Sequence, residues 1–67
     1  MLVKRSFTLA GHRTSVALEP EFWQALAAIA AERPCSIAAL VAEVDANRPP
    51  ERPLASALRV HALLRPR

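Results

Sequence analysis

The sequence has one cysteine, one glycine and no long apolar run, and each scarcity excludes a class of protein. The single cysteine, Cys35, cannot form an internal disulfide, and the two histidines, His12 and His61, are too far apart for clustered metal-ligand spacing. No stretch approaches the roughly 20 apolar residues of a membrane span, and the short basic start does not resemble a signal peptide. We therefore expect a cytoplasmic protein without metal, cofactor or membrane segment.

The length of 67 residues predicts a single domain, residues 1–67, that has no room for a catalytic cleft. A domain of this size buries only about 60% of the surface that its unfolded chain exposes, so a single chain is marginally stable. No catalytic residue is expected, because no activating context surrounds Cys35 or any serine. The sequence predicts a non-enzyme that gains stability by forming a homodimer.

Charge is unevenly distributed along the chain. Residues 1–13 carry three basic residues and no acid, whereas residues 19–51 hold all six acids with two arginines, a local balance of −4. Residues 52–67 contain four arginines and no acid. A basic segment such as Lys4, Arg5 and His12 can contact nucleic-acid phosphates. The same charges also suit an ordinary solvated surface.

Hydrophobic periodicity predicts the order strand, helix, helix, linker, helix. Apolar and polar residues alternate over 13–18, which is typical of a strand, and the segment 1–12 is interpreted as a basic arm or an extra strand, with a turn or bulge at Gly11. Pro20 suits the first turn of a helix over 20–33, and Ser36 suits the N-cap of a helix over 36–47. A proline-rich linker over 48–53 leads to a third helix over 54–65, whose Arg59 and Arg65 should face solvent and which Pro66 should end.

A single strand over 13–18 lacks a partner unless residues 4–9 fold back. The same strand of a second chain would complete an antiparallel ribbon, with Thr14, Val16 and Leu18 on the buried face. The opposite face would present Arg13, Ser15 and Ala17 on a ribbon of the width that the DNA major groove admits. The sequence thus indicates a mainly α protein whose two-stranded ribbon reads DNA.

The residues also resemble a known family. The run from Arg13 to Trp23, Arg-Thr-Ser-Val-Ala-Leu-Glu-Pro-Glu-Phe-Trp, followed by the Ser36-Ile37 helix start, is similar to a ribbon-helix-helix DNA-binding domain. It is most similar to a compact bacterial group in which Lys-Arg-Ser and Gly-His-Arg stretches precede this pattern. The resemblance covers residues 4–64, and it departs from the family at the turn between the helices, where Pro34-Cys35 replaces the usual glycine.

The resemblance implies a dimeric transcriptional repressor whose paired strands enter the major groove. Bases would be contacted by Arg13, Ser15 and Ala17, with Arg13 able to pair in bidentate fashion with guanine. The main-chain amides near Ser36 and Ile37 would bind a backbone phosphate, aided by the helix dipole.

Apolar stripes on the strand and the first two helices form the expected dimer core. Its members are Val16, Leu18, Phe22, Trp23, Leu26, Ile29, Leu40, Val41 and Val44. The third helix is expected to pack on its own dimer. The alternative is a protein-interaction module, an antitoxin-like or scaffold subunit, in which this apolar helix binds another protein and DNA contact is weak or absent.

Overall fold

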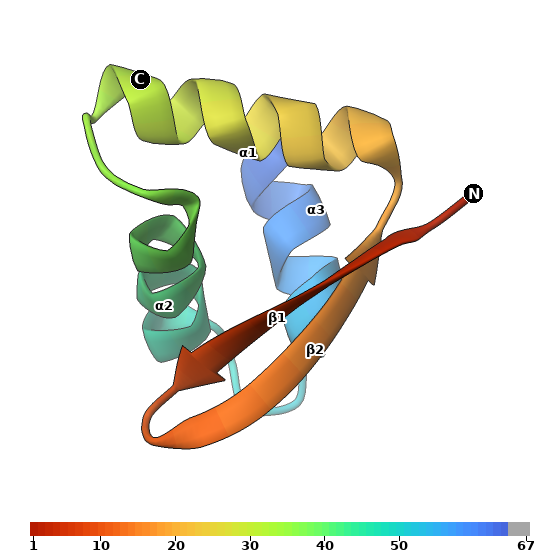
Figure 1. The fold of residues 1–67 in the computed structure, drawn as a ribbon. Coiled ribbons are helices and arrows are strands. Elements are labelled where there is room, and N and C mark those ends of the chain that lie inside the picture. The colour runs from red at the N-terminus through yellow and green to blue at the C-terminus, as the bar shows by residue number, and fades with distance from the viewer. Residues whose placement is uncertain (65–67) are drawn as a thin grey trace.

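The N-terminal third of the chain is a β-hairpin (Figure 1). The computed structural model describes residues 1–64, and its two strands, β1 (Val3–Leu9) and β2 (His12–Leu18), pair antiparallel from Leu9 opposite His12 to Val3 opposite Leu18. Two residues join them, Ala10 at φ 51° and Gly11 at φ 80°. Positive φ at both central positions is what a type I′ hairpin turn requires, and its twist matches that of the strands.

The hairpin decides between the two interpretations of residues 1–12. We expected β2 to pair with the same strand of a second chain, with residues 1–12 as an arm or an extra strand. Residues 3–9 form the extra strand, and they fill one edge of β2 within the same chain. The turn at Gly11 that the sequence indicated is the hairpin turn. The structure thus shows strand pairing within one chain, and in the described residues the sheet consists of these two strands, so the second edge of β2 is open. Pairing of this edge with a second chain stays a prediction.

The first two helices begin and end close to the predicted positions. Helix α1 (Pro20–Glu32) has Pro20 in its first turn, and the carbonyl of Glu19 accepts a hydrogen bond from the Phe22 amide at 3.0 Å. Helix α2 (Ile37–Asn47) is capped by Ser36, whose hydroxyl accepts a hydrogen bond from the Ala39 amide at 3.0 Å. The prediction of Ser36 as an N-cap is confirmed, because its side chain satisfies one of the unpaired amides of the first turn.

Helix α3 (Leu54–Leu64) follows the proline-rich linker and returns against the other two helices. The side chain of Arg48 holds the linker, since its guanidinium binds Asp45 at 2.9 Å and the Arg52 carbonyl at 2.7 Å. The expectations for Arg65 and Pro66 lie outside the described residues. Arg59 differs from its predicted solvent-facing position, because it donates a hydrogen bond to the Glu19 carboxylate at 3.0 Å and is only 34% exposed.

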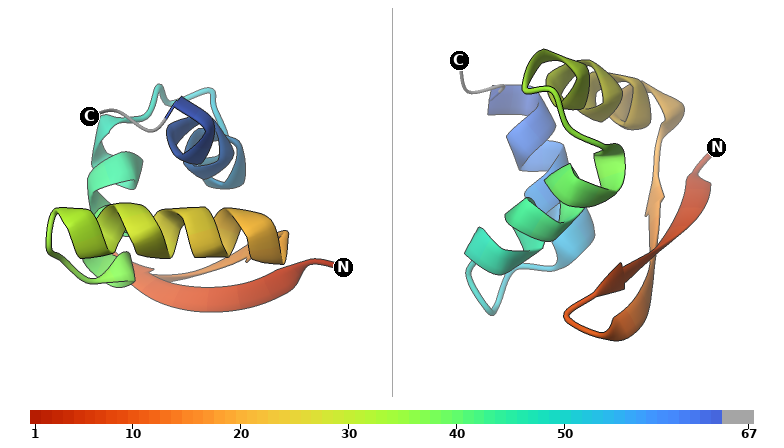
Figure 2. Two further views of the ribbon diagram at one scale, coloured as in Figure 1. Left: turned by 90° about the horizontal axis from the view of Figure 1, so that it is seen from above. Right: turned by 60° about the vertical axis from the view of Figure 1, so that its left-hand side comes forward.

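One hydrophobic core joins all five elements, and the helices lie on one side of the hairpin (Figure 2). The apolar side chains of the strands and helices meet in this core. Its largest fully buried side chains are Leu18, Leu26, Leu40, Val41 and Leu58. Helix α3 belongs to this core through Leu54, Ala57, Leu58 and Ala62, so it packs on its own chain.

Within residues 1–64, no single helix is long and apolar enough to cross a membrane. Only α1 and α2 together reach the length and composition of a span, and they are bent by 98° at the break between them.

Candidate nucleic-acid interface

The face of the hairpin that points away from the helices is the candidate interface. Side chains alternate across a strand, and residues directly opposite each other in a ladder share a face. The register therefore puts three pairs on this face, which we call the outer face: Lys4 with Ala17, Ser6 with Ser15, and Thr8 with Arg13. Five of these side chains are exposed and Ala17 is half-buried.

The other face of the hairpin is mainly apolar and packs against the helices, although Arg5 and His12 on it are exposed. Leu9, Val16 and Leu18 are buried on it, and Val3 and Phe7 pack against the same core. The ring of Phe7 lies 5.9 Å from that of Trp23, centroid to centroid, and the Trp23 indole N–H donates a hydrogen bond to the Val3 carbonyl at 2.8 Å. These contacts fix both strands against the helices, so the outer face is presented on a rigid support.

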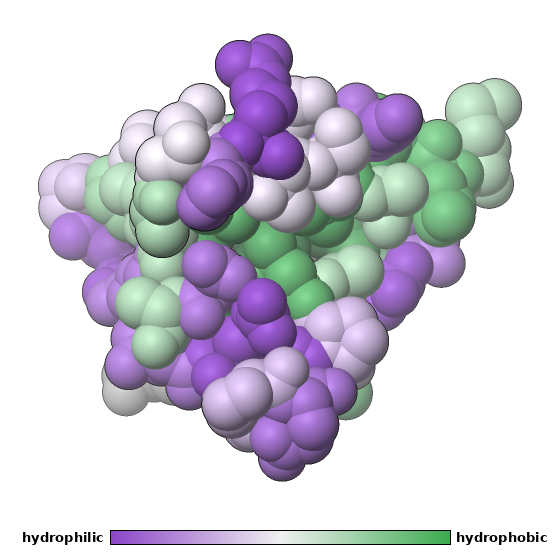
Figure 3. Space-filling view, turned by 90° about the horizontal axis from the view of Figure 1, so that it is seen from below, coloured by the Kyte–Doolittle hydropathy of each residue, from purple (hydrophilic) through white to green (hydrophobic). Residues whose placement is uncertain are grey.

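The outer face carries positive charge at its two ends and hydroxyl groups between them. Lys4 lies at one end and Arg13 near the turn at the other, and no acidic residue shares the face. In the middle, the hydroxyl oxygens of Ser6 and Ser15 are 3.2 Å apart. Figure 3 shows the molecule from below. Hydrophilic residues, in purple, project from its upper edge among pale residues of intermediate hydropathy, and a green hydrophobic strip lies beneath them. Cations and small hydroxyl donors are the groups that bind phosphates and base edges in a groove.

The residues expected at the base edges lie together, since Arg13, Ser15 and Ala17 share the outer face. Sequence reasoning did not find Ser6 and Thr8, which lie beside them on β1. The signal was available in the alternation of residues 4–9, but the sequence left open whether this segment folds back on the strand over 13–18.

The residues expected at phosphates lie in separate places. Lys4 is on the outer face, and His12 is exposed beside the turn, opposite Leu9. Arg5 is on the other face, where its guanidinium carbon lies 4.9 Å from the centroid of the Trp23 ring. Arg5 and Ile37 line one cavity of about 230 Å³, most of whose other lining residues belong to α1. The hydroxyl of Ser36 accepts a hydrogen bond from the Ala39 amide. The groups of this helix start that can bind an anion are therefore main-chain amides and not the Ser36 hydroxyl.

The residues expected in a dimer core lie in the core of one chain. Eight of the nine are buried, and Phe22 is half-buried with the Arg59 guanidinium carbon 5.8 Å from its ring centroid. Burial of these stripes therefore requires no second chain.

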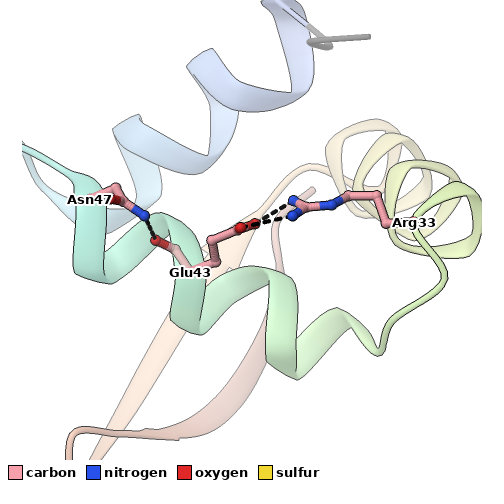
Figure 4. A network of polar contacts seen from close by, with 3 residues as sticks. All are labelled: Arg33, Glu43 and Asn47. Carbon is pink, nitrogen blue, oxygen red and sulfur yellow. Dashed lines mark hydrogen bonds and ion pairs between the residues drawn. The ribbon is translucent and has the colours of Figure 1, made fainter.

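Two ion pairs fasten the helices, and the sequence did not reveal either of them. Arg33, just after α1, binds the carboxylate of Glu43 on α2 through two nitrogens, and the Asn47 side chain donates to the Glu43 carbonyl at 2.8 Å (Figure 4). The hydrogen bonds from Arg33 lower the pKa of the Glu43 carboxyl. A hydrogen bond from its own main chain, followed by the one from Arg59, lowers the pKa of Glu19. The Arg33–Glu43 pair joins the end of α1 to α2, and the Glu19–Arg59 pair joins the residue that follows β2 to α3.

A second surface feature lies between α2 and α3. A groove of about 340 Å³ is bounded by Glu43, Arg48 and His61, and Leu64 lies at its edge. The side chains of Leu63 and Leu64 are 79% and 72% exposed. Among the described helices, these two residues are the exposed large hydrophobic side chains.

Comparison with known proteins agrees with this architecture. No curated protein and no solved structure significantly matches the chain. A family model described as a ribbon-helix-helix domain matches residues 2–65, nearly the whole sequence. Members of that family are generally DNA-binding transcription regulators or antitoxins, they generally form dimers, and they are typically not enzymes. With strands followed by helices in the expected order and a match along almost its full length, the chain belongs to the ribbon-helix-helix domain family.

Proposed function

We propose that this protein binds double-stranded DNA in a sequence-specific manner and acts as a transcriptional repressor in the bacterial cytoplasm. The observation that carries the proposal is the outer face of the hairpin, which is uncovered, rigidly backed, free of acids and basic at both ends. A two-stranded ribbon of this kind fits the major groove, which is about 12 Å wide.

In this proposal the base edges are read mainly by Arg13. Its guanidinium can donate two hydrogen bonds to guanine O6 and N7, and each such pair gives about 1–3 kcal/mol of discrimination. Ser15 adds a hydroxyl, and the methyl group of Ala17 can contact the methyl group of thymine. All three side chains come from β2 and share one face.

Phosphates are held around the ribbon by Lys4, Arg5 and His12 and by the α2 N-terminus at Ser36 and Ile37. The shared cavity of Arg5 and Ile37 supports this role, because a guanidinium and the positive end of a helix dipole there attract the same anion. These contacts set orientation and affinity but not sequence preference.

The test is fluorescence anisotropy of a labelled duplex from the upstream region of the protein's own gene, compared with a scrambled duplex at two salt concentrations. The Arg13→Ala variant should lose preference for the upstream duplex by about 5- to 150-fold. Arg52→Ala removes the same charge from the linker, which lies on the far side of the helices from the hairpin (Figure 2), and should retain the preference. Equal binding of both duplexes by the unaltered protein, or an unchanged preference in Arg13→Ala, would refute the proposal.

We further propose that the DNA-bound form is a homodimer, in line with the general behaviour of the family. Two protomers on adjacent sites double the number of base contacts and favour palindromic or tandem operators. Sedimentation velocity of the protein with the upstream duplex should give two chains per minimal site. A stable complex with one chain would contradict the homodimer.

The alternative function is a protein-interaction module, and the exposed pair Leu63 and Leu64 is the observation in its favour. Removing α3 would not test it, because Leu54 and Leu58 belong to the core. The double substitution Leu63→Ser with Leu64→Ser alters only exposed side chains. If it abolishes function in cells while DNA binding persists, the protein-interaction reading gains; if it has no effect, the DNA-binding reading stands.

A further inference from the structure

We infer that the groove between α2 and α3 binds a small organic monocarboxylate with an apolar body, held by the guanidinium groups of Arg48 and Arg52. The groove has a volume of about 340 Å³, which falls within the range of about 300–1,000 Å³ of ligand pockets. All of its lining residues lie between residues 33 and 64, so it shares no residue with the hairpin. The inference goes beyond the proposed function and stands or fails independently of it.

The first argument is the apolar part of the groove. Its apolar lining residues are Val44 from α2, Pro49 from the linker and Ala57, Val60 and Leu64 from α3. Val44 and Ala57 are 8% and 7% exposed and belong to the hydrophobic core. A ligand that covers these carbon atoms removes apolar surface from water, which favours binding. The groove therefore suits a ligand with an apolar body.

The second argument is the balance of charge at the groove. Arg33 binds Glu43 through two nitrogens, and Arg48 binds Asp45 at 2.9 Å, so each of these arginines has an acidic partner. Arg52 also lines the groove and is exposed. Within residues 1–64 the hydrogen bonds of Arg52 are made by its main chain, and its guanidinium has no partner. One positive charge is thus uncompensated, which matches a ligand with one negative charge.

The third argument is that Arg48 is held in place beside this free charge. Its Nε donates to the Asp45 carboxylate, and its Nη1 donates to the Arg52 carbonyl at 2.7 Å. A guanidinium has five N–H donors, so these two bonds leave Arg48 with donors to spare, on a side chain that is 28% exposed. A side chain fixed before the ligand arrives loses little conformational entropy on binding. Arg48 and Arg52 together can therefore donate to both oxygens of one carboxylate.

The fourth argument is the state of His61. Its side chain lines the groove, and its Nε2 is buried without a hydrogen-bond partner among residues 1–64. A buried polar atom without a partner costs free energy. Rotation of the ring toward the groove would give this nitrogen a ligand oxygen as its partner. Ligand binding should therefore change the surroundings of the His61 ring.

The experiment titrates the full chain with benzoate and with hexanoate, an aromatic and an aliphatic monocarboxylate, and follows the main-chain amides and the His61 ring by NMR. Saturable shifts should be confined to the groove, above all at Ala57, Val60 and His61. Benzamide has nearly the shape of benzoate but no charge, and it should bind about 10- to 150-fold more weakly, the range of a hydrogen bond to a charged group. Acetate and inorganic phosphate, which lack the apolar body, should also bind more weakly than benzoate.

Three results of this titration would overturn the inference. Equal binding of benzamide and benzoate would show an apolar groove that does not recognise charge. Binding of acetate or phosphate as tight as that of benzoate would show a site for bare anions. The absence of saturable shifts in the groove with both carboxylates would show that it binds no ligand of this class.

Two arginine variants form a matched pair that separates this inference from the proposed function. Arg52→Ala should weaken benzoate binding by about 10- to 150-fold. Arg13→Ala removes the same charge from the hairpin and should bind benzoate like the unaltered protein. A melting curve by circular dichroism checks that both variants fold. Unchanged benzoate binding by Arg52→Ala would overturn the inference, whereas groove binding by a protein without DNA preference would leave it standing and refute the proposed function.

Discussion

Replacing Leu58 by alanine tests whether α3 is a structural part of the domain or a segment available to a partner. Leu58 is fully buried, at 0% exposure, in the core that joins α3 to the hairpin and the other helices. Leu63, five residues further along the same helix, is 79% exposed. The two leucines thus form a matched pair on one element, with the same side chain in opposite surroundings.

The expected magnitude follows from burial. Leucine to alanine in a core costs about 2–5 kcal/mol, as the sum of lost transfer free energy and the cavity that remains. A domain of 67 residues has a total unfolding free energy of about 3–10 kcal/mol. Leu58→Ala should therefore remove a large fraction of the stability, and Leu63→Ala should change it by less than about 0.5 kcal/mol.

Thermal unfolding followed by circular dichroism at 222 nm measures the difference. Since 1 kcal/mol shifts the Tm of a domain this small by roughly 4–8 °C, Leu58→Ala should lower Tm by at least about 8 °C. The Tm of Leu63→Ala should stay within a few degrees of the unaltered protein. Equal, small shifts for both variants would refute the placement of α3 in the core and would leave its apolar face free for another protein.

Three further predictions address the hairpin, its attachment and the ion pairs. Ala10→Asn should raise the unfolding free energy by up to about 1 kcal/mol in urea titrations, because asparagine tolerates the left-handed φ of 51° better than alanine; a loss of stability would contradict the turn geometry. Trp23→Phe should cost about 1–3 kcal/mol, because the Val3 carbonyl loses its hydrogen-bond donor, and amide exchange should quicken first in β1. The lowered pKa of Glu43 means that its pair with Arg33 stabilises the fold above the ordinary carboxyl pKa and is lost as the pH falls through the lowered value. Glu43→Gln should accordingly flatten the loss of Tm on acidification below about pH 4.3, and an unchanged slope would show that the pair contributes nothing.

Sequence reasoning located the elements whose signals are local. The Glu19-Pro20 helix start and the Ser36 cap depend on hydrogen bonds within one turn, so the residues themselves carry the information. The alternation over residues 4–9 was visible too, but its partner was not. Alternation indicates a strand and a buried face, and it does not specify which other strand completes the ladder.

The turn explains why the sequence left the pairing of residues 4–9 open. Its central dipeptide is Ala10-Gly11, and an alanine with positive φ is a weak signal beside the Asn-Gly or Asp-Gly that usually marks such a turn. The Glu19–Arg59 pair was missed for a different reason, because its members are 40 residues apart and meet only after α3 has folded back. On the candidate interface the same division holds: alternation within β2 identified Arg13, Ser15 and Ala17, whereas Ser6 and Thr8 required the register between strands.

The two-residue turn between β1 and β2 has a consequence for how the protein folds. Both strands and the helices that cover them come from one chain, and the strands join through the shortest of hairpin loops. The loop-closure entropy of this pairing is small, and its rate does not depend on a collision between two chains. In an obligate intertwined dimer, by contrast, stability cannot be separated from protomer concentration. The hairpin of this chain should therefore form in a first-order step, at a rate that dilution does not change and before any contact between protomers.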